Sequence, residues 1–340
     1  MSLSDATNNT FKLNRPSAAI AALPALLGFT PELSLALLLI TDGKLTATAR
    51  VDLTDARSLI DTLAYSAAAG GADTVIAVVV DAEGAQCDVC GAERRELIVA
   101  LRDALSERGI ELVGAHVVDR VEAGGHWRCY DDCGAGGLIE DPAESLVMLA
   151  AVLEGRVVHK NRQALEELIT ISDPARTAHL ADLLAEAERR NDLTSETKIA
   201  AELTAALATL RTLSATQTLA DSDAVRLAVA LADHRIRDCL IGLSAGSQAH
   251  EAVELWTRLS QLLPESHRVE PLALLALSSY AIGESPKAGI ALTEALRINP
   301  SHRLAGLLDV ALTTAMPPEQ VRELAVQGYR MAQRYGVHLP

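Results

Sequence analysis

The strongest hydrophobic feature of the chain is the segment DTVIAVVVD at residues 73–81. Its six consecutive apolar residues, most of them β-branched, are typical of a strand buried on both faces, because a half-buried strand would alternate with polar residues. Helical patterns precede and follow it at residues 55–69 and 92–108. We expect these two helices to cover the two faces of the strand, which places it at the centre of a layered α/β domain.

Caps and turn residues predict the elements before this strand. Pro16 opens a helix that ends at Gly28, because proline lacks the N–H that a first turn leaves unpaired and glycine tolerates the left-handed conformation after a last turn. The Asp42-Gly43 pair separates two strand-like runs, which is a strong hairpin signal. The sequence therefore predicts a helix followed by a β-hairpin over residues 33–53.

The elements after the central strand complete a mixed sheet. Residues 110–118 form another long apolar run, and Gly124-Gly125 predicts the turn of a second hairpin. The strands separated by helices should run parallel with right-handed crossovers, whereas the hairpins add antiparallel strands. We therefore predict an α/β domain with a mixed sheet and helices on both faces over residues 15–138, preceded by a flexible arm at residues 1–14.

After Asp141-Pro142 the apolar spacing becomes helical and remains so, which predicts an all-α domain over residues 142–340. Acidic and hydroxyl side chains that can accept the first unpaired N–H groups mark several helix starts, such as Asp173-Pro174. The first five predicted helices span residues 143–154, 161–170, 174–190, 195–212 and 222–243.

The end of the helical domain shows internal similarity. Pro264 and Pro300 lie 36 positions apart, and each follows a helix with a similar spacing of small and large apolar residues. Residues 269–302, with a turn at Gly283, resemble a tetratricopeptide repeat, which is a pair of antiparallel helices. The pattern favours repeat-like helix pairs over about residues 235–334, and an irregular helical domain is the alternative.

Composition narrows the range of partners. The formal net charge of −15 at pH 7 repels nucleic acid and anionic membranes, so we expect neither as a partner. The apolar stretch at residues 18–40 is interrupted by two prolines, a glycine and a glutamate before it reaches the roughly 20 residues needed to span a bilayer. The start of the chain is polar and has no secretory-signal pattern, so we expect a cytoplasmic protein.

Several segments in both halves resemble an actinobacterial family that contains the domain of unknown function numbered 4192. They lie at residues 26–31, 34–35, 49–53, 124–127 with Tyr130, 255–259, 271–276, 304–312 and 317–318. These segments are typical of structural positions and contain no catalytic motif. The resemblance implies the two-part architecture and a bacterial cytoplasmic setting, and it implies no particular reaction.

Four cysteines form two closely spaced pairs, Cys87 with Cys90 and Cys129 with Cys133. Together they have the donor set of a tetrahedral zinc site, since the expected hairpin places Cys129 opposite Arg120 at the edge where the Cys87 loop leaves the sheet. We nevertheless expect ordinary loop thiols and no bound metal, and the zinc site and a redox pair are the alternatives. We expect no other cofactor.

Acidic residues follow several predicted strands. Ligands of open α/β sheets bind outside the carboxyl ends of parallel strands, so this edge is the candidate ligand site. Its candidate residues are Asp81, His116, Asp119, Arg120, Trp127 and Tyr130. No phosphate-binding glycine motif and no nucleophile motif accompanies them.

The leading hypothesis is a non-catalytic interaction or scaffolding protein. Its C-terminal helices would bind a protein partner, and its α/β domain would hold a small ligand. Self-association through the helical tail, giving a homo-oligomer, is a further alternative. An enzyme is the alternative of a different class: a hydrolase or nucleotide-using protein with a pocket that contains both Asp81 and Asp119.

Overall fold

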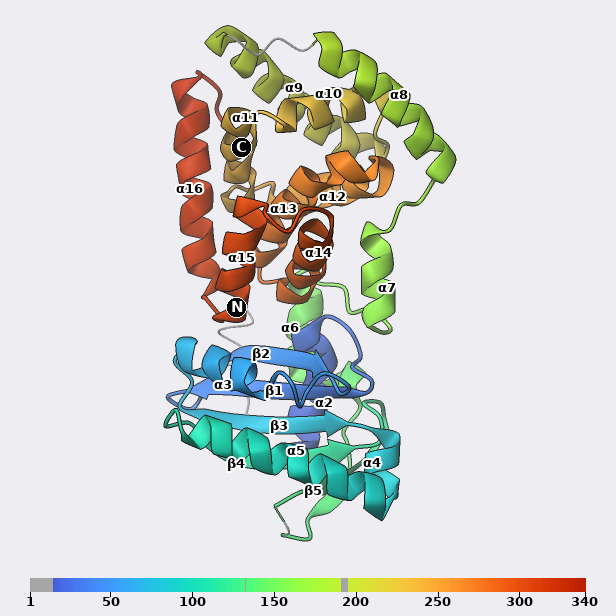
Figure 1. Cartoon of the computed structure of the whole chain (residues 1–340), viewed down its shortest axis with the longest axis vertical. Helices are drawn as coiled ribbons and strands as arrows, with labels where there is room; N and C mark the ends of the chain where they lie inside the picture. Colours follow the sequence, from blue (N-terminus) through green and yellow to red (C-terminus); the bar gives the residue numbers. More distant parts are fainter. Residues whose placement is uncertain (1–14, 132, 191–194) are drawn as a thin grey trace. The chain divides into compact units, whose positions relative to one another are not determined.

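The computed structural model describes residues 15–131, 133–190 and 195–340 (Figure 1). The chain forms two compact units. The first ends at Ala164 and also takes in Thr313–Ala315, and the second comprises Leu165–Leu312 and Met316–Pro340. The predicted architecture of an α/β part followed by a helical part is confirmed. The predicted arm at residues 1–14 lies outside the described residues.

The first elements form as their caps predict. Helix α2 spans Pro16–Leu27 and ends at Gly28, which has a left-handed φ of 71°. Strands β1 (Ser34–Thr41) and β2 (Lys44–Asp52) pair antiparallel. Asp42 and Gly43 between them have φ values of 50° and 73°. Two successive positive φ values are the signature of a type I′ turn, whose twist matches that of the strands it joins.

The six-stranded sheet has the order β2-β1-β3-β4-β5-β6. Its remaining strands are β3 (Thr74–Val80), β4 (Glu111–Val118), β5 (His126–Cys129) and β6 (Gly136–Leu138). Strands β3 and β4 are parallel, and the other neighbours are antiparallel. The sheet is therefore mixed, as predicted, but β1 lies between β2 and β3, and β6 was not predicted.

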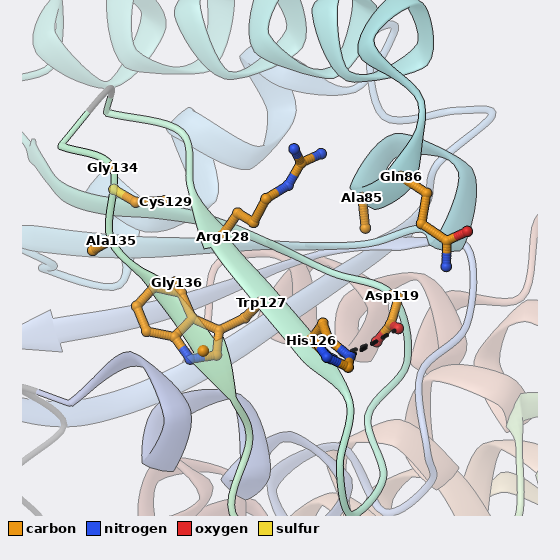
Figure 2. A pocket seen from close by; sticks show the side chains of 11 residues that line it. Ala85, Gln86, Asp119, His126, Trp127, Arg128, Cys129, Gly134, Ala135 and Gly136 are labelled. Atoms are coloured by element: carbon orange, nitrogen blue, oxygen red, sulfur yellow. Dashed lines mark hydrogen bonds and ion pairs between the residues drawn. The ribbon is translucent and has the colours of Figure 1, made fainter.

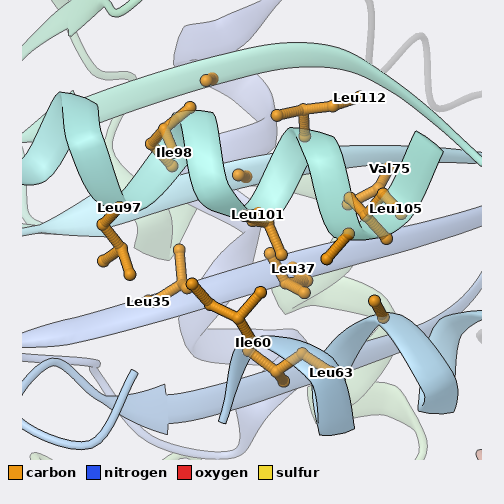
Figure 3. Packing of buried hydrophobic residues seen from close by; sticks show 14 of the residues in the cluster. Leu35, Leu37, Ile60, Leu63, Val75, Leu97, Ile98, Leu101, Leu105 and Leu112 are labelled. Atoms are coloured by element: carbon orange, nitrogen blue, oxygen red, sulfur yellow. The ribbon is translucent and has the colours of Figure 1, made fainter. Parts of the chain in front are cut away.

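Helices α3 (Ile60–Ala69) and α5 (Asp88–Ser106) lie on the same face of the sheet (Figure 3). The expectation that these two helices cover opposite faces of β3 is wrong. Strands β2, β3 and β4 point the same way and step across the sheet in one direction, so two crossovers of the same hand deliver both helices to one side. Leu101 of α5 and Leu63 of α3 meet Leu37 of β1 in this core.

The opposite face of the sheet is also buried. Leu38 of β1 and Val78 of β3 point away from the α3–α5 core and are 0% exposed. Helix α2 lies on this side of the sheet in Figure 1. The prediction that the central strand is buried on both faces is confirmed, because residues 75–80 are all buried.

Helix α6 (Leu146–Leu153) belongs with the sheet. It follows the 3₁₀ turn η1 (Pro142–Glu144), and its Val147 and Ala151 pack on Ala22 and Ala25 of α2. The segment after α6 is also attached to the sheet unit, since Thr30 N–H donates to the His159 carbonyl (3.1 Å). The first unit therefore extends past the expected boundary near residue 138 and takes in the first of the predicted helices.

The loop between β4 and β5 is wider than predicted. Cys129 pairs with His116, so the expected pairing of Cys129 with Arg120 is wrong. The Asp119 carboxylate accepts the N–H groups of Arg120 and His126, both at 2.7 Å, and these bonds close a loop rather than a two-residue turn. The expected loop at residues 81–91 instead contains the short helix α4 (Ala82–Gln86) and the start of α5.

Helices make up the second unit. The second unit begins within helix α7 (Arg162–Glu166), and the 3₁₀ turn η2 (Glu167–Ile169) follows. The remaining elements are α8 (Pro174–Arg190), α9 (Glu196–Thr216), α10 (Asp221–Leu231), α11 (His234–Leu240), η3 (Ile241–Ala245), α12 (Ala249–Leu262), α13 (Glu265–Ala281), α14 (Ser285–Ile298), α15 (Arg303–Thr313) and α16 (Pro318–Arg334).

One predicted helix of this unit is divided. Residues 222–243 were expected to form a single helix, but α10 ends near Ala232 and α11 starts anew at His234. Asp233 causes the break, since its extended backbone (φ −86°, ψ 113°) and its carboxylate, which accepts the Arg235 N–H, make it an N-cap. The predicted turn at Gly283 between α13 and α14 is confirmed, with a φ of 84°.

Arg268 joins three neighbours of α13. Its side chain donates to the Ser260 carbonyl of α12 (2.8 Å), to the Ile169 carbonyl of η2 and to the Glu294 carboxylate of α14 (3.0 Å). The residue is only 5% exposed. Each of the three guanidinium nitrogens donates a hydrogen bond to a different element, so this buried side chain fixes the positions of three elements.

Candidate functional site

A pocket of about 600 Å³ lies at the β5–β6 edge of the sheet (Figure 2). Strand β5 supplies Trp127 and Arg128, helix α4 supplies Gln86, and the glycine-rich segment at residues 134–137 supplies mostly backbone. The Arg128 guanidinium reaches the Gly84 carbonyl at 3.4 Å. The pocket therefore offers an indole ring, a guanidinium and peptide groups to a ligand.

Asp119 lines this pocket, but its carboxylate already has partners. In addition to the two backbone N–H groups, it forms an ion pair with Arg120 (2.9 Å), and His126 Nδ1 lies 3.8 Å away. Arg120 also pairs with Glu122 (2.6 Å) and is not part of the pocket wall. These two predicted site residues thus organise the β4–β5 loop.

Asp81 and Tyr130 lie on the α5 side of the sheet. The Asp81 carboxylate caps α4 by accepting the Glu83 N–H (3.1 Å) and pairs with Arg94 of α5 (2.9 Å). The Tyr130 ring belongs to the α3–α5 core, and burial raises the pKa of its hydroxyl to about 12. Asp81 is outside the pocket lining that contains Asp119, so these two carboxylates do not line one pocket.

His116 and Trp127 lie on adjacent strands and form an edge-to-face pair. Their ring centroids are 5.3 Å apart at an interplanar angle of 81°. His116 is 7% exposed, and its burial lowers the imidazole pKa despite the opposing charge of Asp131. His116 therefore packs against the indole ring of Trp127, which lines the pocket.

The cysteines come together as pairs. The neighbouring Cys87 thiol raises the pKa of Cys90, and the neighbouring Cys129 lowers the pKa of Cys133. The Cys129 thiol donates to the Asp131 carboxylate at 3.8 Å. Among the residues that the structure describes, no three His, Cys, Asp or Glu side chains gather where they could hold a metal ion. The four cysteines therefore do not come together as one zinc site in the part of the chain that the structure describes.

Helix α6 carries an exposed apolar surface that sequence reasoning missed. Leu146, Leu149, Val152 and Leu153 are exposed by 53%, 54%, 59% and 79%. They lie opposite the residues that pack on α2, since the helix sequence LVMLAAVL is apolar on all sides. The sequence does contain a signal for this surface. The eight residues of α6 include no charge, which is typical of a helix that is covered on all sides.

A groove of about 510 Å³ adjoins this surface. Met148, Val152 and Val157 line its apolar part, and Val157 is itself 66% exposed. Arg156, which pairs with Glu154 at 3.1 Å, and the exposed Lys160 also line it. The exposed side of α6 together with this groove is called the α6 surface below.

Comparison with known protein families finds one match, which covers most of the chain. The family model of the domain of unknown function DUF4192 matches residues 16–319. The chain belongs to this family. No curated protein and no solved structure matches it. In this DUF4192 member, none of the helices in the described ranges has both the length and the hydropathy needed to cross a membrane.

Proposed function

We propose that this protein is a non-catalytic interaction protein, and that the α6 surface binds an amphipathic, acidic segment of a partner protein. The observation that carries the proposal is the exposure of Leu146, Leu149 and Leu153, each by more than half, on a helix anchored to α2 by its other side. Burying one leucine side chain gains about 1.5–3 kcal/mol, so several adjacent leucines supply a strong drive for association.

The spacing of these leucines suits a helical partner. Leu146, Leu149 and Leu153 recur at i, i+3 and i+7, which places them in one row along α6. A row of this kind packs against the apolar side of a second helix, the mode used when an amphipathic helix lies in a groove. The adjoining groove extends the contact with Met148 and Val157.

The size and charge of the surface favour a partner segment over a second copy of the chain. Helix α6 has eight residues, which corresponds to about 12 Å of length, and a stable dimer needs roughly 800 Å² from each partner. Arg156 and Lys160 line the groove, and Arg156 is already paired with Glu154 (3.1 Å). The exposed Lys160 is the cation that favours an acidic segment, although the net charge of −15 opposes the approach of such a segment.

The second unit supplies a further part of this proposal. Helices α13 and α14 form a pair joined at Gly283, which supports the tetratricopeptide-like interpretation of residues 269–302. Leu307 and Val310 of α15 are 68% and 61% exposed. We propose this helix as a second contact for a protein partner.

The test uses two synthetic helical peptides with leucine on one side and either glutamate or lysine on the other. We expect fluorescence anisotropy to show tighter binding of the glutamate peptide to the full chain. Replacing Leu149 and Leu153 by alanine should weaken binding at least about tenfold, because each leucine contributes more than 1.4 kcal/mol when buried. Val99→Ala is the matched control, since Val99 is 52% exposed on α5.

Lys160→Glu separates the charge contribution from the apolar one. It should weaken the glutamate peptide and strengthen the lysine peptide, while the alanine variants weaken both. Equal binding of the two peptides by the native chain, or the same loss in Val99→Ala as in the leucine variants, would overturn the proposal. Concentration-dependent dimerisation abolished by the leucine variants would assign the surface to self-association instead.

A further inference from the structure

Two cysteines with the spacing C-x-x-C stand at the start of α5. Helix α5 begins at Asp88, so Cys87 is its N-cap and Cys90 is its third residue. N-cap and third-residue side chains face each other across a first turn, as they do in a capping box. The Cys87 side chain caps no backbone N–H, and the Cys87 thiol is near enough to Cys90 to raise its pKa.

The position of this pair in the fold suits thiol chemistry. It lies in the crossover between the parallel strands β3 and β4, directly after α4. Cys87 is exposed and Cys90 is half-buried, so a reagent can reach the pair from solvent. Unpaired N–H groups at the start of a helix stabilise a thiolate, and α5 has 19 residues.

Exposure and position distinguish the two sulfurs. Cys87 is the exposed N-cap, whereas Cys90 is half-buried in the first turn. The neighbouring Cys87 thiol and burial also raise the pKa of Cys90. Cys87 is therefore the attacking thiol, and Cys90 is the resolving thiol.

We propose that Cys87 and Cys90 form a reversible dithiol–disulfide site that exchanges with dialkyl disulfides. Cys87 thiolate attacks one sulfur of the disulfide RS–SR, forms a mixed disulfide and releases RS⁻, which takes a proton from solvent. Cys90 then loses its proton and attacks Cys87 Sγ, which closes the internal disulfide and releases the second thiol. Two protein thiols are oxidised, and one disulfide is reduced to two RSH.

The remaining cysteines serve as internal references. Cys129 and Cys133 are a second closely spaced pair of cysteines, which serine replacements remove from the experiment. Cys239 is 0% exposed, and burial raises its pKa from 9.0 to about 11. Two pH units correspond to about 100-fold less thiolate, so Cys239 should react at least that much more slowly.

The test uses the full chain with Cys129→Ser and Cys133→Ser, equilibrated with glutathione disulfide. We expect the loss of two reactive thiols without added mass, and a peptide map in which Cys87 is joined to Cys90. Adding Cys90→Ser should stop the reaction at a glutathione adduct on Cys87. Adding Cys87→Ser should greatly slow the reaction, and serine there preserves the helix start because it is a favoured N-cap.

Two outcomes would overturn the proposal. One is a chain in which Cys87 and Cys90 each carry a glutathione adduct and no internal disulfide forms. The other is a chain in which both thiols stay reduced at a glutathione disulfide excess that oxidises free dithiothreitol. Circular dichroism of each variant confirms that the fold is present when thiols are counted.

Discussion

Replacing Arg268 by methionine tests the packing of the second unit most directly. Methionine keeps much of the apolar volume of the arginine stem and removes the three hydrogen bonds made by the guanidinium. The carbonyls of Ser260 and Ile169 then lose charged donors, whereas Glu294 retains Arg297 (2.7 Å). The damage is therefore concentrated on two buried carbonyl groups.

The magnitude follows from these contacts. A hydrogen bond to a charged group contributes about 1.5–3 kcal/mol, and breaking a buried ionic contact on one side costs about 3–5 kcal/mol. We therefore expect Arg268→Met to lower the free energy of unfolding of the second unit by about 3–5 kcal/mol. Arg268→Lys should lie between native and methionine, because one ammonium cannot reproduce the planar fork that meets partners on three elements.

Urea denaturation monitored by tryptophan fluorescence measures this loss. The chain has two tryptophans, and Trp256 is 0% exposed in α12, next to the contact. A Trp127→Phe background leaves Trp256 as the only reporter, so the signal comes from the second unit alone. The change in midpoint at constant slope then gives the difference in free energy.

Arg226→Met is the matched control. Arg226 also pairs with a carboxylate, Glu202 at 2.7 Å, but its side chain is 51% exposed. Exposed pairs of this kind contribute less than about 1 kcal/mol. If Arg268→Met lost no more than Arg226→Met, the inference that this guanidinium holds three elements together would be refuted.

Three further predictions concern the first unit. Leu101→Ala, at a 0% exposed position of α5, should cost about 2–5 kcal/mol by urea denaturation, whereas Val99→Ala on the same helix should cost less than about 0.5 kcal/mol. Asp81→Ala should cost about 2–4 kcal/mol, because it removes both the α4 cap and the partner of Arg94; a loss below 1 kcal/mol would contradict its assignment as a structural residue. Burial lowers the pKa of His116 below the ordinary value of 6.5, so the unfolded chain binds more protons between these two pKa values. Stability should therefore fall as pH drops through 6.5 toward the native pKa, by at most about 1.4 kcal/mol per pH unit, and His116→Phe should remove this slope.

Local signals in the sequence determine the first elements of the fold. The Pro16 start and the Gly28 stop each act within one turn, and the Asp42-Gly43 turn needs only its own two residues. The order of the strands in the sheet does not follow from such local signals. Nothing between residues 33 and 53 indicates that β1 lies between β2 and β3, and this insertion determines which face the crossover helices cover.

In the candidate site too, the sequence predicts local features but not the contacts between distant residues. The sequence indicates which acids follow strands, and Asp119 and Trp127 do line a pocket. It does not indicate what their polar atoms bind. The Asp81 carboxylate is occupied by Arg94, which lies 13 positions later, and this contact depends on how α5 packs. The α6 surface was missed because an apolar octapeptide has the same composition whether it is covered on one side or on both.

The two proposed sites lie on opposite sides of one sheet, which predicts that they act independently. The Cys87–Cys90 pair starts α5, which packs on the α3 side, whereas α6 is attached through α2 to the other side. Cys87 and Cys90 both lie at the first turn of α5, and coupling between distant sites requires an element with two arrangements that both sites bias. The glutamate peptide should therefore bind the reduced and the oxidised chain with affinities that agree within about twofold, which is less than the coupling energies typical of allostery. A tenfold difference in anisotropy titrations would show that the sheet transmits the redox state to α6, and the two sites would then form one switch.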